Sequence, residues 1–435
     1  MAKKCDHTPG SSPKKGGAKG GEKEKVHKKP NWKEYTASVE DIKAFLTDRI
    51  YLRHNVITGR VEYRLPSSYT FEGTDLWQPV SDRIVNSLWA ELSKEKTTRV
   101  QDVYRVIESD FVPEFNPFES YLAHLPPWNG EDHILAMSVS VSVKGDVEEQ
   151  MRFYEYLKKW LVAMVAGWID ESVVNNVILV LIGAQGSYKT TWFNHILPPE
   201  LRQYFYTKTN ANRMGRDDLL TLAQYGLVCC EELDTMRPSE LNQLKAAVTM
   251  PSIDERAAYA HFHEHRKHIA SFCGTGNNAQ FLSDPTGNRR WLPFEVESIE
   301  SPREKPFDYE GIYSQAYALY QQNFQYWFSK EEITRLSEHN RQYETPQIEQ
   351  ELVDVFFRRP NEFESGEYMP VSRAMQIVGG SMIQHVNASR LGQAFKSQGY
   401  EYKRTAHSRG YIVVQRDAGE IKERLKMMAI EGEPT

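Results

Sequence analysis

The segment VILVLIGAQGSYKTT, residues 177–191, decides how the rest of the chain is interpreted. Its first part, Val177–Ile182, is apolar and mostly branched, and it is too short for a helix, so it predicts a buried strand. Gly183 and Gly186 then allow a tight turn whose backbone N–H groups point at phosphate oxygens. The turn is followed by Lys189, which has an ammonium group, and Thr190, which has a hydroxyl group, and both groups can contact the phosphates. The segment therefore predicts a phosphate-binding loop.

One position departs from the usual pattern of such loops, G-x-x-x-x-G-K-[ST], which places glycine immediately before the lysine. Here that position is Tyr188, so an ordinary turn between a strand and a helix is the alternative interpretation. We expect Thr190–Leu197 to form the helix whose positively polarised N-terminus faces the phosphates. The residues expected to bind ATP are Gly183, Gln185, Gly186, Ser187, Tyr188, Lys189, Thr190 and Thr191.

A second apolar strand, Leu227–Cys230, runs directly into Glu231, Glu232 and Asp234. A phosphate loop needs a carboxylate near its threonine to hold Mg²⁺ and a base to polarise the attacking water. Strand alternation places Glu231 and Glu232 on opposite faces, so one glutamate would hold Mg²⁺ while the other polarises the attacking water. The sequence leaves open which of the three acids is the base. The alternative interpretation is an acidic cap on a following helix. The predicted Mg²⁺ ligands are Thr190, Glu231 and Glu232.

Two more polar groups follow in an order that suits phosphate chemistry. A strand at 270–275 leads to Asn277, whose side chain can hydrogen-bond the attacking water or the γ-phosphate. Arg289 and Arg290 come next, and guanidinium groups neutralise charge on a transferred phosphoryl group. In ring ATPases such an arginine often reaches the neighbouring subunit's site. A surface ion pair is the alternative for these arginines.

Between the acids and Asn277, the segment 257–273 has two apolar alternating arms around a basic centre and predicts a hairpin with a basic tip. A tip that contacts DNA is one interpretation, and a solvated hairpin is the other. Zinc is disfavoured because no cysteine or paired acid completes a ligand set with the histidines. The candidate DNA contacts are His263, His265, Arg266 and Lys267.

Three segments, GAQGSYKTTWF, CCEELDTM and GTGNNAQFLSDPTGNRRW, together resemble the virulence-associated protein E (VapE) family. Its members are phage- and island-encoded relatives of the superfamily-three helicases, within the AAA+ ATPases. The resemblance covers residues 118–294 and implies an ATP- and Mg²⁺-dependent ATPase that forms a hexameric ring and grips single-stranded DNA with the hairpin. The roles it implies are Lys189 and Thr190 on the nucleotide, Glu232 and Asp234 in the family's E-L-D motif, Asn277 as sensor, and Arg289 or Arg290 as arginine finger.

Two positions depart from that family and bear on the rate of hydrolysis. The family more often has glycine where Tyr188 stands, and an acid where this chain has Cys229. Residues 31–150 contain no recognisable primase domain, so a primase would be a separate partner.

The C-terminal region shows three short helical patterns followed by two alternating segments around a basic turn. This order resembles a winged helix, which would make duplex DNA a second partner. A module that contacts only proteins is the alternative. The candidate contacts to phosphates and base edges are Arg390, Lys396, Lys403, Arg404 and Arg409.

Length and composition bound these interpretations. A chain of 435 residues, 40% of them hydrophobic, supports two to four domains in an α/β fold. The net charge of −6 excludes a uniformly basic, histone-like protein but allows local basic patches. The longest apolar run near the middle, 160–169, is too short to cross a bilayer, and the four cysteines form no metal-binding pair, so we expect a cytoplasmic protein without a membrane partner.

The domains expected from these patterns are a disordered lysine-rich tail at 1–35, an α-rich domain at 36–150, an AAA+ ATPase core at 151–300, a helical connector at 301–345 and a winged-helix-like domain at 346–435. The tail either attracts nucleic acid or keeps the chain in solution.

The function predicted from the sequence is an ATP-driven DNA helicase or replication initiator of a phage or mobile genetic element. Two other classes stay open. One is an AAA+ switch that remodels a protein complex, for example in defence, and the other is a DNA-binding regulator with a weakened ATPase site.

Overall fold

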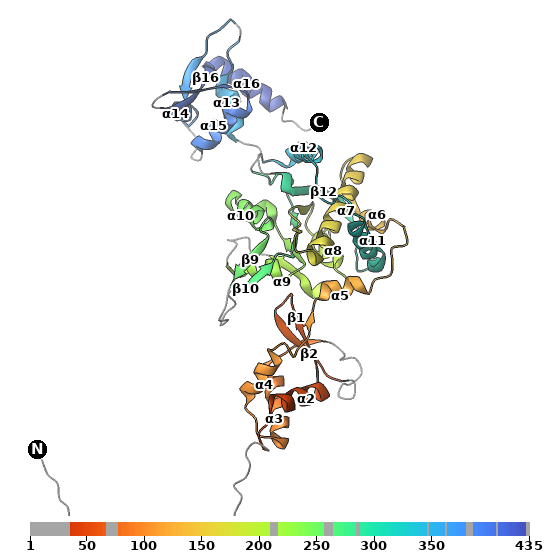
Figure 1. Ribbon diagram of the computed structural model, residues 1–435. Coiled ribbons are helices and arrows are strands. Elements are labelled where there is room, and N and C mark those ends of the chain that lie inside the picture. The colour runs from red at the N-terminus through yellow and green to blue at the C-terminus, as the bar shows by residue number, and fades with distance from the viewer. Residues whose placement is uncertain are drawn as a thin grey trace, which may run out of the picture. The chain divides into compact units, whose positions relative to one another are not determined.

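The computed structural model forms two compact units, one ending at Phe115 and the other beginning at Asn116 (Figure 1). The predicted boundary at residue 150 therefore lies inside the second unit, and most of the predicted lysine-rich tail lies outside the described residues. No helix in the described part of the chain has the length and apolar character needed to span a membrane. The structure describes residues 35–66, 77–208, 216–255, 264–283, 288–345, 348–361, 363–379, 386–405 and 408–431.

The first unit is a mixture of helices and strands, whereas the sequence predicted a mostly helical domain. Ser38 and Asp41 form a capping box at the start of its first helix. β1 and β2 form an antiparallel hairpin, and a further short strand on each side gives a four-stranded sheet in the order β3-β2-β1-β4. Its elements are α2 (Val39–Arg49), β1 (Tyr51–Asn55), β2 (Arg60–Arg64), β3 (Gln78–Pro79), α3 (Asp82–Glu95), α4 (Val100–Ile107) and β4 (Glu114–Phe115).

The second unit is built on a six-stranded sheet in the order β5-β12-β6-β11-β8-β7. All neighbouring strands run parallel except β5, which is antiparallel to β12. β6, β8 and β11 are buried throughout, as expected for parallel strands covered on both faces. The strands are β5 (Val141–Val143), β6 (Ile178–Ile182), β7 (Phe205–Lys208), β8 (Leu227–Cys230), β11 (Ser271–Gly276) and β12 (Trp291–Ile299).

A long apolar helix, α7, anchors the chain to this sheet. The indole of Trp160 donates to the Phe272 carbonyl over 3.0 Å, and that of Trp168 donates to the Gly226 carbonyl over 3.2 Å. Because each indole is buried and hydrogen-bonded, the helix has one fixed register on the strands. The helices and the small hairpin of this region are α5 (Pro117–Ala123), α6 (His133–Ser138), α7 (Val147–Ile169), α8 (Lys189–Ile196), α9 (Arg216–Gln224), α10 (Pro238–Val248), β9 (Ser252–Glu255), β10 (Glu264–Lys267), α11 (Tyr309–Gln321) and α12 (Lys330–His339).

The C-terminal region has its own hydrophobic core, in which Phe395 stacks on Tyr411 at a ring distance of 5.1 Å. Three helices and a hairpin occur where the sequence predicted them, and the last helix was not predicted. The assignment as a winged helix stays a prediction. The elements are α13 (Ile348–Phe356), β13 (Phe357–Arg358), β14 (Glu367–Pro370), α14 (Val371–Val378), α15 (Ala388–Ser397), β15 (Glu401–Arg404), β16 (Arg409–Gln415) and α16 (Ala418–Glu431).

Candidate nucleotide site

The predicted phosphate loop connects β6 to α8, at the centre of the sheet. The backbone N–H of Gly183 donates to the Gly276 carbonyl over 3.1 Å, which ties the start of the loop to the end of β11. A Cβ at Gly183 would lie 3.1 Å from the Val296 carbonyl oxygen, so a larger residue would push on β12. Gly186 has a φ of 82°, which favours glycine. Both predicted glycines therefore have a local structural role.

Tyr188 takes the backbone shape of the glycine that it replaces. Its φ of 61° and ψ of 11° lie in the left-handed region, directly before α8. For a residue with a Cβ, that conformation is less stable than the right-handed one by roughly 1–2 kcal/mol. The side chain is 48% exposed, so the ring projects away from the loop while the backbone completes the turn. The departure from the motif thus changes the surface of the loop and leaves its path intact.

Lys189 is folded back into the loop and is 7% exposed. Its ammonium donates to the carbonyls of Gly183 and Ala184, both at 2.7 Å, and to the Ser187 hydroxyl at 3.2 Å. Burial lowers the pKa of Lys189, and the charge of Asp234 opposes that shift. The loop therefore holds a desolvated cation at the place where a phosphate would bind.

Glu231, the first of the acids after β8, contacts the loop. The Thr190 hydroxyl donates to the Glu231 carboxylate over 2.8 Å. Glu232 has a φ of 55° and a ψ of 45°, so a left-handed turn, and not strand alternation, sets the different directions of the two glutamates. Glu232 is exposed, and it lines the same cavity as Glu231. The three predicted Mg²⁺ ligands therefore belong to one cavity.

Asp234 has a different environment from the two glutamates. One of its carboxylate oxygens accepts from the backbone N–H of Asn278 over 3.1 Å, which holds the segment after β11. The other oxygen, Oδ1, is buried and has no hydrogen-bond partner within the described residues. Asp234 is also absent from the residues that line the cavity. It is therefore placed to position the Asn277 segment and to act electrostatically on Lys189.

The cavity has a volume of about 410 Å³. Thr275, at the end of β11, lines it and was missed from the sequence, although it lies two residues before Asn277 and so on the same side of an extended strand. The lining residues are Gln185, Gly186, Ser187, Tyr188, Lys189, Thr190, Thr191, Glu231, Glu232, Thr275, Gly276 and Asn277.

The two predicted arginine-finger residues lie away from this cavity. Arg289 and Arg290 end the short helix Asn288–Arg290, immediately before β12. β12 is parallel to β6 and pairs Trp291 with Ile178, at the opposite end of β6 from the loop. The intervening strand spans roughly 13 Å.

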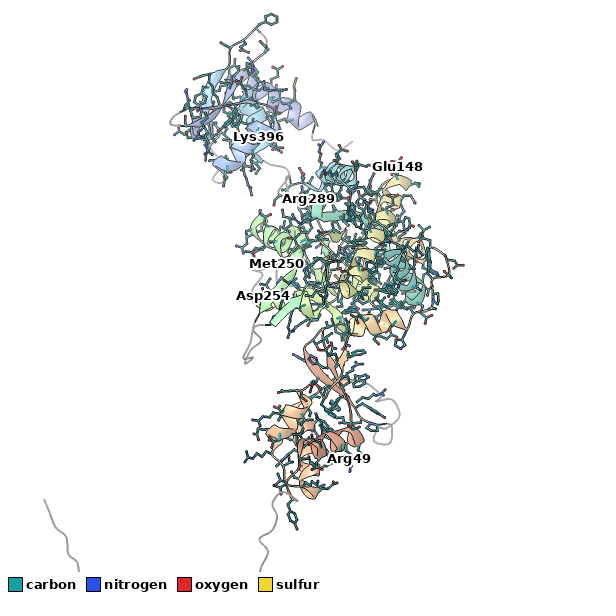
Figure 2. All side chains as sticks on the ribbon, viewed as in Figure 1. Arg49, Glu148, Met250, Asp254, Arg289 and Lys396 are labelled. Atoms are coloured by element: carbon teal, nitrogen blue, oxygen red, sulfur yellow. The ribbon has the colours of Figure 1, made fainter. Side chains whose placement is uncertain are left out.

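A second cavity, of about 400 Å³, contains both arginines and is lined also by Ser172, Thr249 and Trp327. Figure 2 shows Arg289 near α12, whose residue Ile333 lines the same cavity. Burial lowers the pKa of Arg290, and the neighbouring charge of Arg289 lowers it further. The arginines therefore share a cavity of their own, in which Arg290 is partly buried and Arg289 is exposed.

The predicted basic hairpin exists, but its strands differ from the predicted ones. β9 pairs with β10, so His265, Arg266 and Lys267 lie on the second strand and not at the tip, because the pairing begins upstream at Ser252. His265 Nδ1 lies 2.7 Å from the carboxylate of Asp254, which is labelled in Figure 2. Burial lowers the pKa of Lys267. His263 lies outside the described residues.

The predicted DNA contacts of the C-terminal region are all on the surface. Leu391 and Phe395 of α15 are buried, as the helical pattern predicted. Lys403 and Arg404 are on β15, and Arg404 pairs with Arg409 of β16 next to the turn that joins the two strands. The exposed basic residues are Arg390, Lys396, Lys403, Arg404 and Arg409.

Together these features define a mixed α/β protein built on a mostly parallel sheet, whose central strand turns through a glycine-containing loop into a helix. Comparison with protein families assigns residues 123–345 to the virulence-associated protein E-like domain. This match covers just over half of the 435 residues, and the chain belongs to that family.

Solved structures with similarity to this chain are distant in sequence. The C-terminal region of NrS-1 has a TM-score of 0.48 and 12% identity, covering 86% of this chain and 98% of that one. SCCmec type IV Cch, described as an active helicase, has a TM-score of 0.37 and 11% identity, covering 86% and 95%. The comparison with curated proteins gives no match.

Proposed function

We propose that this protein is an ATP-dependent DNA motor, acting as a helicase or replication initiator of a phage or mobile genetic element. The observation that carries the proposal is the 2.8 Å hydrogen bond from Thr190 to Glu231 at the mouth of the loop. A hydroxyl from the loop and a carboxylate from the next strand meet there, beside a buried lysine, which is the arrangement that nucleotide hydrolysis requires.

Mg²⁺ fits this site by the chemistry of its donors. Thr190 and Glu231 offer adjacent hydroxyl and carboxylate oxygens, the hard ligands that this ion prefers, and Glu232 adds a second carboxylate to the same cavity. When bound, Mg²⁺ would neutralise charge on the phosphate oxygens.

The chain's own groups divide the remaining tasks. Lys189 exchanges its carbonyl partners for phosphate oxygens, because an anion compensates the buried ammonium better than neutral carbonyls do. The exposed carboxylate of Glu232 polarises the attacking water, and Asn277 orients it. These assignments leave Asp234 as a positioning residue through its bond to the Asn278 backbone.

The position of the arginines supports a ring. Arg289 and Arg290 lie at the opposite edge of the sheet from their own phosphate loop, so within one chain they cannot reach its nucleotide. We therefore propose that they serve the cavity of a neighbouring subunit in a hexamer. The β9–β10 hairpin would contact single-stranded DNA, and the exposed basic residues of the C-terminal region would contact duplex DNA.

The test compares hydrolysis and strand separation in one set of proteins. The unaltered protein should hydrolyse ATP with Mg²⁺, accelerate on adding single-stranded DNA, and displace a strand from a forked duplex. Glu231→Gln should lose these activities, because the amide is a poor ligand for Mg²⁺. Lys305→Ala, which alters an exposed lysine paired with Glu300, is the matched control and should behave like the unaltered protein.

The outcomes separate the proposal from its alternatives. If the rate of ATP hydrolysis does not change on adding DNA and no strand is displaced, the result would favour a switch that remodels protein complexes. DNA binding without hydrolysis would favour a regulator with an inactive site. Either result would contradict the motor.

A further inference from the structure

Among the residues that the structure describes in the first unit, the helices pack against one face of the sheet and not against the other. Leu52, Val61 and Tyr63 point to the covered face and pack against the core formed by α2, α3 and α4. Strand residues alternate between faces, so Tyr51 and Arg53 of β1 lie on the other face. The antiparallel register places Arg64 opposite Tyr51 and Glu62 opposite Arg53, on that same face.

The open face carries aromatic rings and guanidinium groups that alternate in space. The Arg53 guanidinium lies 3.7 Å from the centre of the Phe115 ring and 4.1 Å from that of Trp77. The Arg64 guanidinium lies 5.3 Å from the Trp77 ring and 5.1 Å from the Tyr51 ring. Five side chains therefore form a stack in the order Phe115, Arg53, Trp77, Arg64, Tyr51, which we call the aromatic–arginine stack.

The stack is held rigidly at one end and open at the other. Arg53 donates from both Nε and Nη2 to the Glu62 carboxylate at 2.7 Å, and Asn55 donates to the second oxygen of Glu62 at 2.7 Å. Tyr51, at the open end, is 50% exposed. The two arginines of the stack and Glu62, the carboxylate that Arg53 contacts, together carry a net positive charge.

We propose that the aromatic–arginine stack is a binding site for single-stranded nucleic acid. Unpaired bases stack on exposed aromatic rings and on guanidinium planes, and arginine attracts the phosphates between them. At the open end of the stack, the half-exposed ring of Tyr51 offers a surface for a base, and the Arg64 guanidinium beside it offers a charge for a phosphate. A duplex keeps its bases paired, so it would not gain the stacking contacts.

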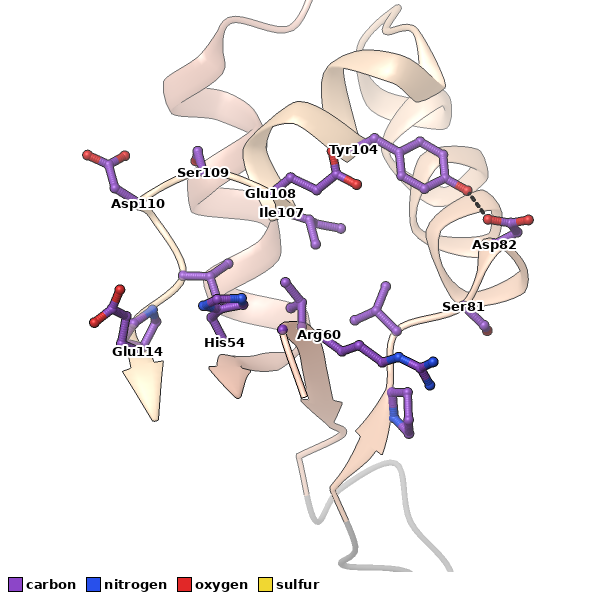
Figure 3. Close-up of a pocket in the computed structure, with 16 residues that line it drawn as sticks. His54, Arg60, Ser81, Asp82, Tyr104, Ile107, Glu108, Ser109, Asp110 and Glu114 are labelled. Atoms are coloured by element: carbon purple, nitrogen blue, oxygen red, sulfur yellow. Dashed lines mark hydrogen bonds between the residues drawn. The ribbon is translucent and has the colours of Figure 1, made fainter. Parts of the chain in front are cut away.

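The helix-covered side of the same sheet has the opposite character. A cavity of about 930 Å³ lies there, lined by His54 and Val61 of the sheet and by Tyr104 of α4 (Figure 3). Its other lining residues include the carboxylates of Asp82, Glu108, Asp110 and Glu114. Four acids against one arginine, Arg60, give this cavity a negative charge that would repel phosphate, so the open face is the side of this unit that suits nucleic acid.

The test measures the binding of fluorescently labelled oligothymidylate to the full chain, without nucleotide. Tyr51→Ala should weaken the affinity by about tenfold, because it removes the most exposed stacking ring. Tyr51→Phe should keep the affinity, since it retains the ring. The matched control is Tyr35→Ala, which removes another exposed tyrosine of the same unit, one that lies outside the stack, and should have no effect. Parallel titrations use oligouridylate and a blunt DNA duplex.

Equal affinity of Tyr51→Ala and the unaltered protein for both oligonucleotides would overturn the proposal. If that variant instead changed the mass of the assembly in solution, the face would be a protein contact, which also overturns it. Weaker binding of the single strands with unchanged duplex binding supports it. Thermal unfolding of each variant confirms that the unit is folded. Because nucleotide is absent and the ATPase cavity is unaltered, these results stand independently of whether the chain hydrolyses ATP.

Discussion

The two edges of the six-stranded sheet present different sets of polar groups. At the edge where β6 ends, the loop, the acids and Asn277 converge on one cavity. At the edge where β12 begins, Arg289 and Arg290 line another cavity with three aromatic residues and no acid among its lining residues. Each edge holds a cation whose burial lowers its pKa, Lys189 at the first and Arg290 at the second.

The difference between the edges indicates how such a fold organises its site. Groups that must contact one nucleotide together come from the carboxyl ends of adjacent parallel strands, which the sheet brings to one place. A group that is needed only when subunits meet can lie at the other edge, where it cannot act on its own nucleotide. We call the edge that holds the phosphate loop the loop edge, and the edge that holds Arg289 and Arg290 the arginine edge. The comparison predicts that the loop edge is required in every subunit, whereas the arginine edge acts between subunits.

Lys189→Ala should have the largest effect, reducing ATP hydrolysis to background while the fold is retained. The substitution removes the ammonium that three loop acceptors hold in place, and with it the cation that would receive the phosphate. Phosphate release in the presence of Mg²⁺ measures the activity, and circular dichroism checks the fold. Unchanged turnover would break the assignment of this edge as the nucleotide site.

Replacing both Arg289 and Arg290 with alanine should reduce turnover by about 10³-fold or more, with ATP binding largely retained. The reason is that these guanidiniums would act on the transition state and lie outside the binding cavity of their own chain. Turnover and nucleotide affinity are measured separately, the latter with a fluorescent ATP analogue.

Mixing the two inactive proteins sharpens the comparison. A double-arginine variant retains its loop, and Lys189→Ala retains its arginines, so a mixed ring contains some complete sites. Partial recovery of hydrolysis on mixing is the expected result. No recovery, from variants that demonstrably co-assemble, would show that the arginines do not act between subunits.

Much of this arrangement could be predicted from the sequence because its strongest signals are local. The strand Leu227–Cys230 has the predicted bounds, since an apolar run depends only on neighbouring residues. The hairpin at 252–267 was placed too far downstream. Its first strand, Ser252–Glu255, is too polar to stand out as a strand, and only pairing with β10 defines it.

The site itself was less accessible to sequence reasoning. The order of Lys189, Glu231 and Asn277 could be recognised, but the left-handed conformation of Glu232 could not, because no residue preference indicates it. The separation of the arginines from the loop depends on the parallel pairing of β12 with β6. Strand order is a property of the whole sheet and cannot be derived from the short segments that carry the motifs.

Asp170 provides a test confined to the arginine edge. It accepts hydrogen bonds from Ser172, a lining residue of the arginine cavity, and from Tyr320, and these lower its pKa from 3.8 to about 2. A carboxyl group with a lowered pKa stabilises the fold above its unfolded pKa and loses that contribution as the pH falls through the folded pKa.

Asp170→Asn should therefore lower the melting temperature at neutral pH by a few degrees. The difference from the unaltered protein should shrink as the pH falls from about 4 towards 2, which calorimetry can follow. A difference that stays constant over this range would mean that the carboxylate charge is not the stabilising feature.

Tyr188 should give the smallest effect and the finest test of the loop edge. Tyr188→Gly relieves the left-handed strain at φ 61° but adds freedom to the unfolded chain, so the two terms oppose each other and the net gain in stability should be below about 1 kcal/mol. Tyr188→Ala removes the ring and keeps the strain, which makes it the matched control. If hydrolysis rises in both variants, the exposed ring hinders turnover; if it rises only in Tyr188→Gly, the backbone strain does. Equal turnover in all three proteins would mean that a tyrosine serves here as well as the glycine that such loops usually have, because the site uses only the path of its backbone.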